Sequence, residues 1–258
     1  MNHKYIFLLA TAMWWSCSSD KQEVTFDPIK VDRTVSLTND QDSPQCHVVL
    51  HVLQNKQATS EVGRKMNQAI ISKIFDMQDL SVQAAADSFA NSYTQNYVKN
   101  MKPLYREDQS DKEKRPWYEY RYSIDTETVD GREGMTTYII RLEYYEGGAH
   151  GISQQLTLNF DNATGRVLTL NDLYVPGYES RLNELLLQAL LKQTDTKDIE
   201  DLRQHGYLYS MDMFVPENYI LGEDELTFIY NPYEIAPYSE GLIEIKIDND
   251  DLKDLIKK

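Results

Sequence analysis

The sequence contains little cysteine, and this limits how the fold can be held together. Only Cys17 and Cys46 occur among 258 residues, so at most one disulfide could form within the chain. Cys46 alternates with Val48, Leu50 and Val52, which is typical of a small side chain buried on one face of a strand. We therefore expect packing rather than cross-links to stabilise the fold, and we expect no catalytic thiol.

Positive charge is also scarce. The chain has 26 Lys and Arg residues against 41 Asp and Glu residues, which gives a formal net charge of -15. Nucleic acid is therefore excluded as a partner, because phosphate binding requires a basic surface. An acidic surface would attract a cationic partner, but it would equally keep an exported protein in solution.

No hydrophobic run is long enough to cross a bilayer as a permanent helix. The longest apolar segment spans residues 5–15 and follows a short basic start. It ends at Ser16-Cys17, and polar residues follow at once. This arrangement resembles a bacterial lipobox, although Trp14 replaces the usual aliphatic residue.

We therefore predict a signal peptide over residues 1–16, lipidation of Cys17, and a tether over residues 17–32. Acyl chains on Cys17 would anchor the protein to a membrane of the bacterial cell envelope, facing the periplasm or the cell exterior. An ordinary secretory signal with an incidental cysteine is the alternative.

Hydrophobic periodicity predicts helices followed by strands. Ser60 and Ser81 are suited to cap helices that end near Asp76 and Asn100, with Pro103 beyond the second helix. The mixed order of helical and alternating segments predicts an α+β fold with mainly antiparallel sheets packed against helices. The other expected elements are strands over residues 45–53, 118–124, 138–144, 152–160, 226–230 and 243–247, a helix from Ser180 to Gln193, and a short helix beginning at Asp250.

Two connections between predicted strands have an unusual composition. Residues 147–151 read Gly-Gly-Ala-His-Gly, and the glycines permit positive φ and close approach of another backbone. The segment Asn231–Tyr238 contains Pro232 and Pro237, which restrict the loop. Rigid loops of this kind often carry binding residues.

Several segments in a fixed order carry a family resemblance. They are the glycine-rich turn, Asn159-Phe160-Asp161, Thr164-Gly165, the segment Leu168–Leu173, and the Pro-Tyr loop with Gly241. This set resembles a domain-of-unknown-function family found in RsiV-like anti-sigma factors and before the catalytic domain of PdaC-type peptidoglycan deacetylases.

The resemblance implies two α+β modules. These are a PdaC-type module over residues 33–145 and an RsiV-like module over residues 146–258, the latter similar to a subdomain of actin-like ATPases without their chemistry. The resemblance also implies a binding role, with lysozyme or another cationic protein as the partner.

No complete active-site motif is present in the sequence. It has neither a Gly-x-Ser-x-Gly elbow nor a phosphate-binding loop. His47 and His51 have a spacing seen in metal sites, but on a strand at ~3.3 Å per residue they would lie roughly 13 Å apart. We therefore expect no metal and no cofactor.

His150 and Glu146 allow two interpretations. A turn could bring the carboxylate of Glu146 to the imidazole of His150 as a general acid-base pair of a hydrolase. Alternatively, His150 bonds a backbone carbonyl inside the turn and has a structural role. The second interpretation is favoured, because no nucleophile or metal-ligand set accompanies the pair.

Tyr233 and Tyr238 each follow a proline, and they could either form a binding surface or pack back over the sheet. We expect the two loops to form one binding edge. Its predicted ligand-binding residues are Glu146, Gly147, Gly148, His150, Tyr233, Glu234 and Tyr238.

The sequence thus predicts a non-catalytic envelope lipoprotein that binds or senses an extracytoplasmic ligand, such as lysozyme. A module that binds peptidoglycan or another glycan is the alternative, and a hydrolase using Glu146 and His150 is a further one.

Overall fold

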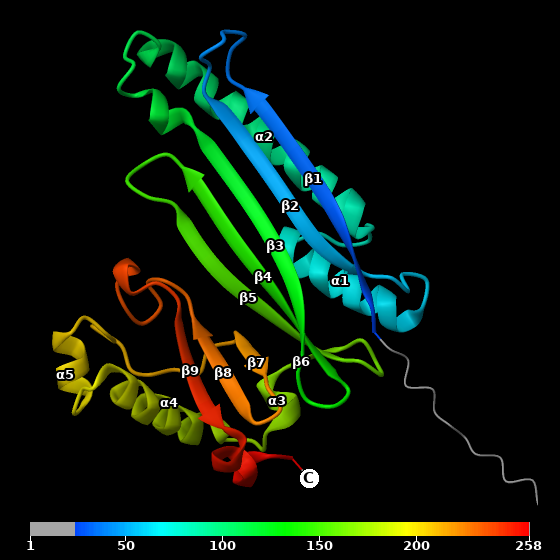
Figure 1. Cartoon of the computed structure of the whole chain (residues 1–258), viewed down its shortest axis with the longest axis vertical. Coiled ribbons are helices and arrows are strands. Elements are labelled where there is room, and N and C mark those ends of the chain that lie inside the picture. Colours follow the sequence, from blue (N-terminus) through cyan, green and yellow to red (C-terminus); the bar gives the residue numbers. More distant parts are fainter. Residues whose placement is uncertain (1–23, 258) are drawn as a thin grey trace, which may run out of the picture.

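Two sheets and the helices that cover them make up the structure, a computed structural model that describes residues 24–257 (Figure 1). The first sheet has six strands in sequence order, and the second has three. The α+β class predicted from the sequence is therefore confirmed. The first sheet contains β1 (Phe26–Ser36), β2 (Gln45–Asn55), β3 (Tyr120–Asp130), β4 (Met135–Glu146), β5 (Ile152–Asp161) and β6 (Val167–Leu168).

All neighbouring strands of the first sheet are antiparallel except β2 and β3, which are parallel. The chain crosses between them through α1 (Glu61–Phe75), α2 (Val82–Asp108) and a short 3-10 helix, η1 (Arg115–Tyr118). Both long helices cover one face of the sheet (Figure 1). On that face, alternate residues of β2 are fully buried, which confirms the expected position of Cys46.

The two helices begin where their capping serines predict. The Ser60 hydroxyl accepts a hydrogen bond from the Gly63 amide, and the Ser81 hydroxyl accepts one from the Ala84 amide. The predicted end of the second helix was wrong, because α2 continues through Pro103. Proline removes one helical hydrogen bond. The helix continues because Tyr105, one turn from its end, is buried and packs edge-on against Tyr118.

The second sheet consists of β7 (Tyr219–Leu221), β8 (Glu225–Tyr230) and β9 (Ile243–Asp248), all antiparallel. Its main helix is α4 (Tyr178–Thr194), whose N-cap residue is Gly177 rather than the predicted Ser180. Gly177 has a φ of 86°, a conformation that glycine adopts without strain. The short elements around it are α3 (Leu170–Leu173), α5 (Ile199–Gln204), η2 (Tyr238–Glu240) and η3 (Asn249–Leu255).

The expected segment boundaries differ from the observed ones in two places. Residues 26–32, expected in the tether, form the first part of β1. Strands β5 and β6, expected in the second module, complete the first sheet, because Leu158 and Phe160 belong to its hydrophobic core. The two cores therefore separate near residues 168–170 rather than at 145–146.

Buried polar side chains join the two halves of the molecule along β5. The side chain of Asn231 accepts a hydrogen bond from the Gln155 amide at 2.6 Å and donates one to the Gln155 carbonyl at 3.1 Å. Next to it, the Thr157 hydroxyl accepts from the Tyr219 amide, and Asn159 donates to the Tyr219 carbonyl. Asn231 thus satisfies the backbone of β5 as a neighbouring strand would.

None of the helices within residues 24–257 is long and apolar enough to cross a membrane. Residues 1–23, including Cys17, lie outside the described part of the chain. The expected similarity of the second half to a subdomain of actin-like ATPases stays a prediction.

Replacing Asn231 with Ala should destabilise the fold by about 2–4 kcal/mol, because a buried amide and a buried carbonyl of Gln155 lose their partners. Denaturant unfolding monitored by circular dichroism measures this. The control is Asn171→Ala at an exposed position, which should change stability by less than about 0.5 kcal/mol. Equal stability of the two variants would contradict the assigned role of Asn231.

Candidate ligand-binding site

The turn between β4 and β5 is held in one conformation. Gly147 has a φ of 81° and Gly148 a φ of 97°, both in the region that favours glycine. A Cβ atom at Gly147 would also lie 2.5 Å from the Trp117 carbonyl oxygen. The Tyr145 hydroxyl donates to the Gly148 carbonyl at 3.0 Å, which fixes the turn from the β4 side.

His150 is oriented by a backbone contact in the same turn. Its Nδ1 atom lies 2.9 Å from the Gly151 carbonyl oxygen. Because a carbonyl can only accept, Nδ1 carries the proton in this contact and Nε2 of the neutral ring is an acceptor. The Tyr233 hydroxyl lies 3.4 Å from Nε2 and is the matching donor.

The loop after β8 is built around Asn231 and a strained tyrosine. The Asn231 amide donates to the Glu234 carboxylate at 2.7 Å, and the Glu234 amide donates to the Asn231 carbonyl. Tyr233 between them has a φ of 72°, a conformation that costs a non-glycine residue about 1–3 kcal/mol. The surrounding hydrogen bonds, including one from the Tyr233 amide to the Ala236 carbonyl, hold it there.

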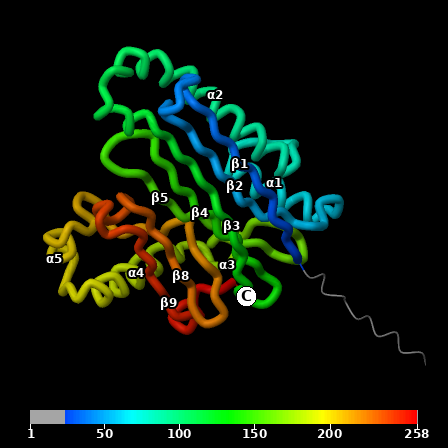
Figure 2. Tube along the Cα trace, turned by 45° about the horizontal axis from the view of Figure 1, so that its top comes forward, coloured from blue at the N-terminus to red at the C-terminus, as the bar shows by residue number. Residues whose placement is uncertain are grey.

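The two loops lie on the same side of the molecule (Figures 1 and 2). Their aromatic side chains form a three-ring cluster. The rings of His150 and Tyr238 stack with their centroids 4.2 Å apart and 19° between their planes. Tyr233 lies beside Tyr238 at 5.6 Å, and it is 62% exposed. The structure therefore brings together His150, Tyr233 and Tyr238 from positions far apart in the sequence.

Glu146 does not join this cluster. It accepts a hydrogen bond from the Tyr93 hydroxyl of α2 at 2.5 Å. Burial, and then this hydrogen bond to Glu146, raise the pKa of Tyr93 well above its usual value. No contact links Glu146 to His150 in the described residues, so the geometry favours the structural interpretation of His150 over the acid-base pair.

A hollow of about 400 Å³ lies beside the ring cluster, on the face of the first sheet opposite α1 and α2. Arg121 and Ser123 of β3 lie beside Glu143 and Tyr145 of β4, since Arg121 pairs with Tyr145 and Ser123 with Glu143. Tyr238 forms part of the same wall. The hollow thus combines aromatic surface, hydroxyl groups and one charge of each sign.

The strand residues of this hollow were not predicted as site residues. They alternate along β3 and β4 with apolar residues that are buried or half-buried, so the sequence indicated only that they share the solvent-facing side of their strands. Their convergence depends on the strand register, which a single sequence does not reveal.

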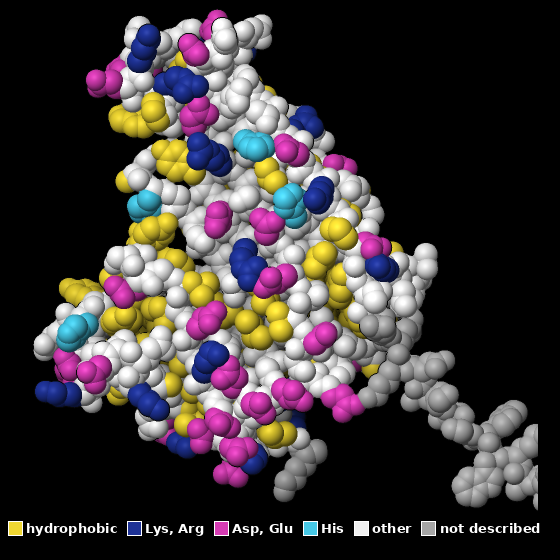
Figure 3. Space-filling model, viewed as in Figure 1, with side chains coloured by type: hydrophobic (Ala, Val, Ile, Leu, Met, Phe, Trp, Pro, Cys, Tyr) yellow, Lys and Arg dark blue, Asp and Glu magenta, His cyan; other side chains and the backbone are white. Residues whose placement is uncertain are grey.

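Charge is mixed on this face of the molecule. Figure 3 shows basic, acidic and histidine side chains interspersed over β2–β4, while acidic side chains gather nearer the C-terminal end. His47 pairs with Asp32 at 3.0 Å and His51 with Asp125 at 2.8 Å. Within the described residues, no group of three or more His, Cys, Asp or Glu side chains is placed to hold a metal ion.

Comparisons with known proteins identify the class. Residues 171–250, from α3 into η3, match the family described as "Protein of unknown function (DUF3298)". A crystal structure of a DUF3298 family member from Bacteroides fragilis NCTC 9343 is 28% identical and has a TM-score of 0.84 over 91% of this chain and 94% of that chain. A DUF3298 family protein from Pseudomonas aeruginosa PAO1 is 16% identical, with a TM-score of 0.63 over 92% and 96% of the two chains, and it supports the fold alone.

Residues 171–250 therefore match the DUF3298 model, and the chain is similar to PdaC, which confirms the PdaC-like part of the predicted resemblance. It is 25% identical over 199 residues to the peptidoglycan-N-acetylmuramic acid deacetylase PdaC of Bacillus subtilis (strain 168). That match covers 76% of this chain and 40% of PdaC, so the chain spans less than half of the length of this relative.

Cys46 should react with alkylating reagents only after unfolding. Burial, and then the charge of Glu146, raise the pKa of the Cys46 thiol to about 12, so the nucleophilic thiolate is scarce at neutral pH. We expect alkylation by iodoacetamide to be more than about a hundredfold slower in the folded protein than in denaturant. Mass spectrometry of the peptide that contains Cys46 measures both rates, and similar rates would contradict its burial.

Proposed function

We propose that this protein is a non-catalytic, lipid-anchored protein of the bacterial cell envelope that binds a glycan of the peptidoglycan type. The observation that carries the proposal is the three-ring cluster of His150, Tyr233 and Tyr238 beside the hollow over β3 and β4. Aromatic faces offer apolar contact to the C–H face of a sugar, and hydroxyl, carboxylate and guanidinium groups can bond its polar edge.

The mixed charge of the hollow favours a neutral or zwitterionic ligand. Arg121 and Glu143 both line it, and the Glu234 carboxylate is already engaged by the Asn231 amide. The name of the curated relative, a peptidoglycan deacetylase, agrees with a cell-wall ligand, although only part of that protein is matched.

Lysozyme or another cationic protein is the second candidate ligand. The net charge of -15 favours it, because such a field speeds encounter with a basic partner. A hydrolase using Glu146 and His150 is the third candidate, and it is disfavoured because Glu146 bonds Tyr93.

Replacing Tyr238 with Ala should weaken glycan binding by about thirtyfold, which corresponds to about 2 kcal/mol. Tyr233→Ala should weaken it as well, because Tyr233 orients His150 and presents an exposed ring. Isothermal titration with soluble peptidoglycan fragments measures both effects. The control is Tyr209→Ala, which removes a tyrosine that is 83% exposed and lies outside the three-ring cluster.

The same titrations at low and moderate salt separate the candidates. Binding of a neutral glycan should change little with ionic strength, whereas lysozyme binding should weaken steeply. Affinity for lysozyme but not for the glycan would support the second candidate. Glycan binding that survives both tyrosine changes would place the site elsewhere, and turnover of the fragments would show that the protein is an enzyme.

Replacing Cys17 with Ala should release the protein from the membrane fraction, because the proposed acyl chains would be lost. The folded domain should be unaffected, since the described core does not include Cys17. Fractionation after a salt wash, with immunoblotting, measures the distribution. The control is Cys46→Ala, which should stay in the membrane fraction; a membrane-bound Cys17→Ala protein would contradict the lipid anchor.

A further inference from the structure

Within the described part of the chain, no strand pairs with the outer edge of β9. β9 pairs with β8 on one side only, and it is the last strand of its sheet. The opposite edge strand of this sheet, β7, lies against β5 through the contacts of Tyr219. β9 therefore has the one long unpaired edge of this sheet.

The hydrogen-bond ladder shows which groups face outward. Asn249 directly follows β9 and lies opposite Asp224, which precedes β8. Its amide donates to the Asp224 carbonyl at 2.9 Å, so these two residues form a hydrogen-bonded pair of the antiparallel ladder. Such pairs alternate with non-bonded pairs. Ile243, Ile245 and Ile247 therefore bond β8, whereas Glu244 and Lys246 direct their amides and carbonyls away from the sheet.

This edge lacks two of the features that block strand pairing, namely proline and a β-bulge. The edge strand β1 of the first sheet contains Pro28, which lacks an amide donor. β9 contains no proline, and its pairing with β8 runs without a bulge. Within residues 24–257, no hydrogen bond reaches the outward amides of Glu244 and Lys246.

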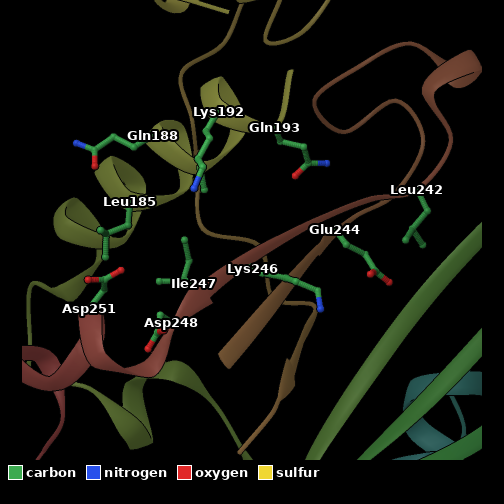
Figure 4. Close-up of a pocket in the computed structure, with 11 residues that line it drawn as sticks. Leu185, Gln188, Lys192, Gln193, Leu242, Glu244, Lys246, Ile247, Asp248 and Asp251 are labelled. Atoms are coloured by element: carbon green, nitrogen blue, oxygen red, sulfur yellow. The ribbon is translucent and has the colours of Figure 1, made fainter. Parts of the chain in front are cut away.

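An open groove of about 880 Å³ runs between this edge and α4. Figure 4 shows α4 on one side, with Gln188 and Lys192, and β9 on the other, with Glu244 and Lys246. Ala189 of α4 also lines the groove.

We infer that a second copy of this chain docks on the edge through its own β9, in an antiparallel arrangement. With Ile245 opposite the partner's Ile245, Glu244 lies opposite the partner's Lys246, and Lys246 lies opposite the partner's Glu244. Opposite charges directly across a strand pair stabilise it, and like charges destabilise it. The same register also pairs the outward amides and carbonyls of Glu244 and Lys246.

The charge pattern selects this register. A shift of two residues in one direction places Glu244 opposite the partner's Glu244, and a shift in the other direction places Lys246 opposite the partner's Lys246. Both shifted registers are therefore disfavoured. The resulting two-fold contact is self-complementary, as the interface of a symmetric dimer must be.

The dimer would contain one continuous sheet made of both copies of β7, β8 and β9. A two-fold axis perpendicular to the sheet keeps α4 and its copy on the same face, where they enclose the two grooves. Because the strands are antiparallel, the loops that precede β9 lie at opposite ends of the joined sheet. The candidate ligand-binding sites therefore stay open, and the inference does not depend on their ligand.

Charge reversal tests the inference. Sedimentation velocity over a range of protein concentrations should show a monomer-dimer equilibrium for the wild-type chain. Glu244→Lys or Lys246→Glu should each raise the dimer dissociation constant by about tenfold or more, because two attractive pairs become repulsive. The double variant Glu244→Lys/Lys246→Glu restores both pairs and should dimerise as the wild type does.

Two controls separate this effect from changes inside one chain. Glu225→Gln removes the ion pair that Lys246 makes with β8 and should leave the dimer intact. Lys30→Glu makes the same charge change on the exposed face of edge strand β1 and should also leave it intact.

Hydrogen exchange locates the interface. The amides of Glu244 and Lys246 should become protected as the concentration rises, while those of Ile243, Ile245 and Ile247 are protected throughout. A monomer at every concentration would overturn the inference and leave the edge for a strand of another protein. A dimer that neither single charge reversal weakens would also overturn it.

Discussion

One buried amide side chain connects the two halves of this molecule. Asn231 bonds both backbone groups of Gln155 and so occupies, with a side chain, the place of a missing strand beside β5. The same residue bonds Glu234 through both of its own backbone groups, which sets the start of the loop that carries Tyr233 and Tyr238. The position of the aromatic cluster over the first sheet thus depends on the buried hydrogen bonds between Asn231 and Gln155.

The cluster is ordered before any ligand arrives. Tyr233 is held at positive φ, His150 is oriented by the Gly151 carbonyl, and Tyr238 stacks on His150. Each of these constraints reduces the conformational entropy that the loops would otherwise lose on binding. Stored backbone strain in a surface loop is typical of sites that act on or hold another molecule.

Most local features of the fold could be predicted from the sequence because their causes are local. The capping of α1 by Ser60 and of α2 by Ser81 and the burial of Cys46 follow from residue type and spacing. The extent of α2 could not be predicted in this way. The burial of Tyr105, a tertiary contact, outweighs the cost of Pro103.

The boundary between the two halves and the residues that line the hollow could not be predicted from the sequence, for a different reason. Strand β5 alternates in the same way whichever sheet it joins, so the sequence alone could not assign it to the first. Arg121, Ser123 and Glu143 converge only once β3 and β4 are aligned in register. Strand pairing and register are relations between segments, and the pattern within one segment does not reveal them.

The parallel pairing of β2 with β3 has a consequence for the order of folding. The β1–β2 hairpin can form early, but its inner edge stays open until residues 56–119 have formed both helices and returned the chain to β3. Closing such a long loop is entropically costly, and pairings of high sequence separation form slowly. We therefore expect the centre of the first sheet to be the last part of that sheet to close.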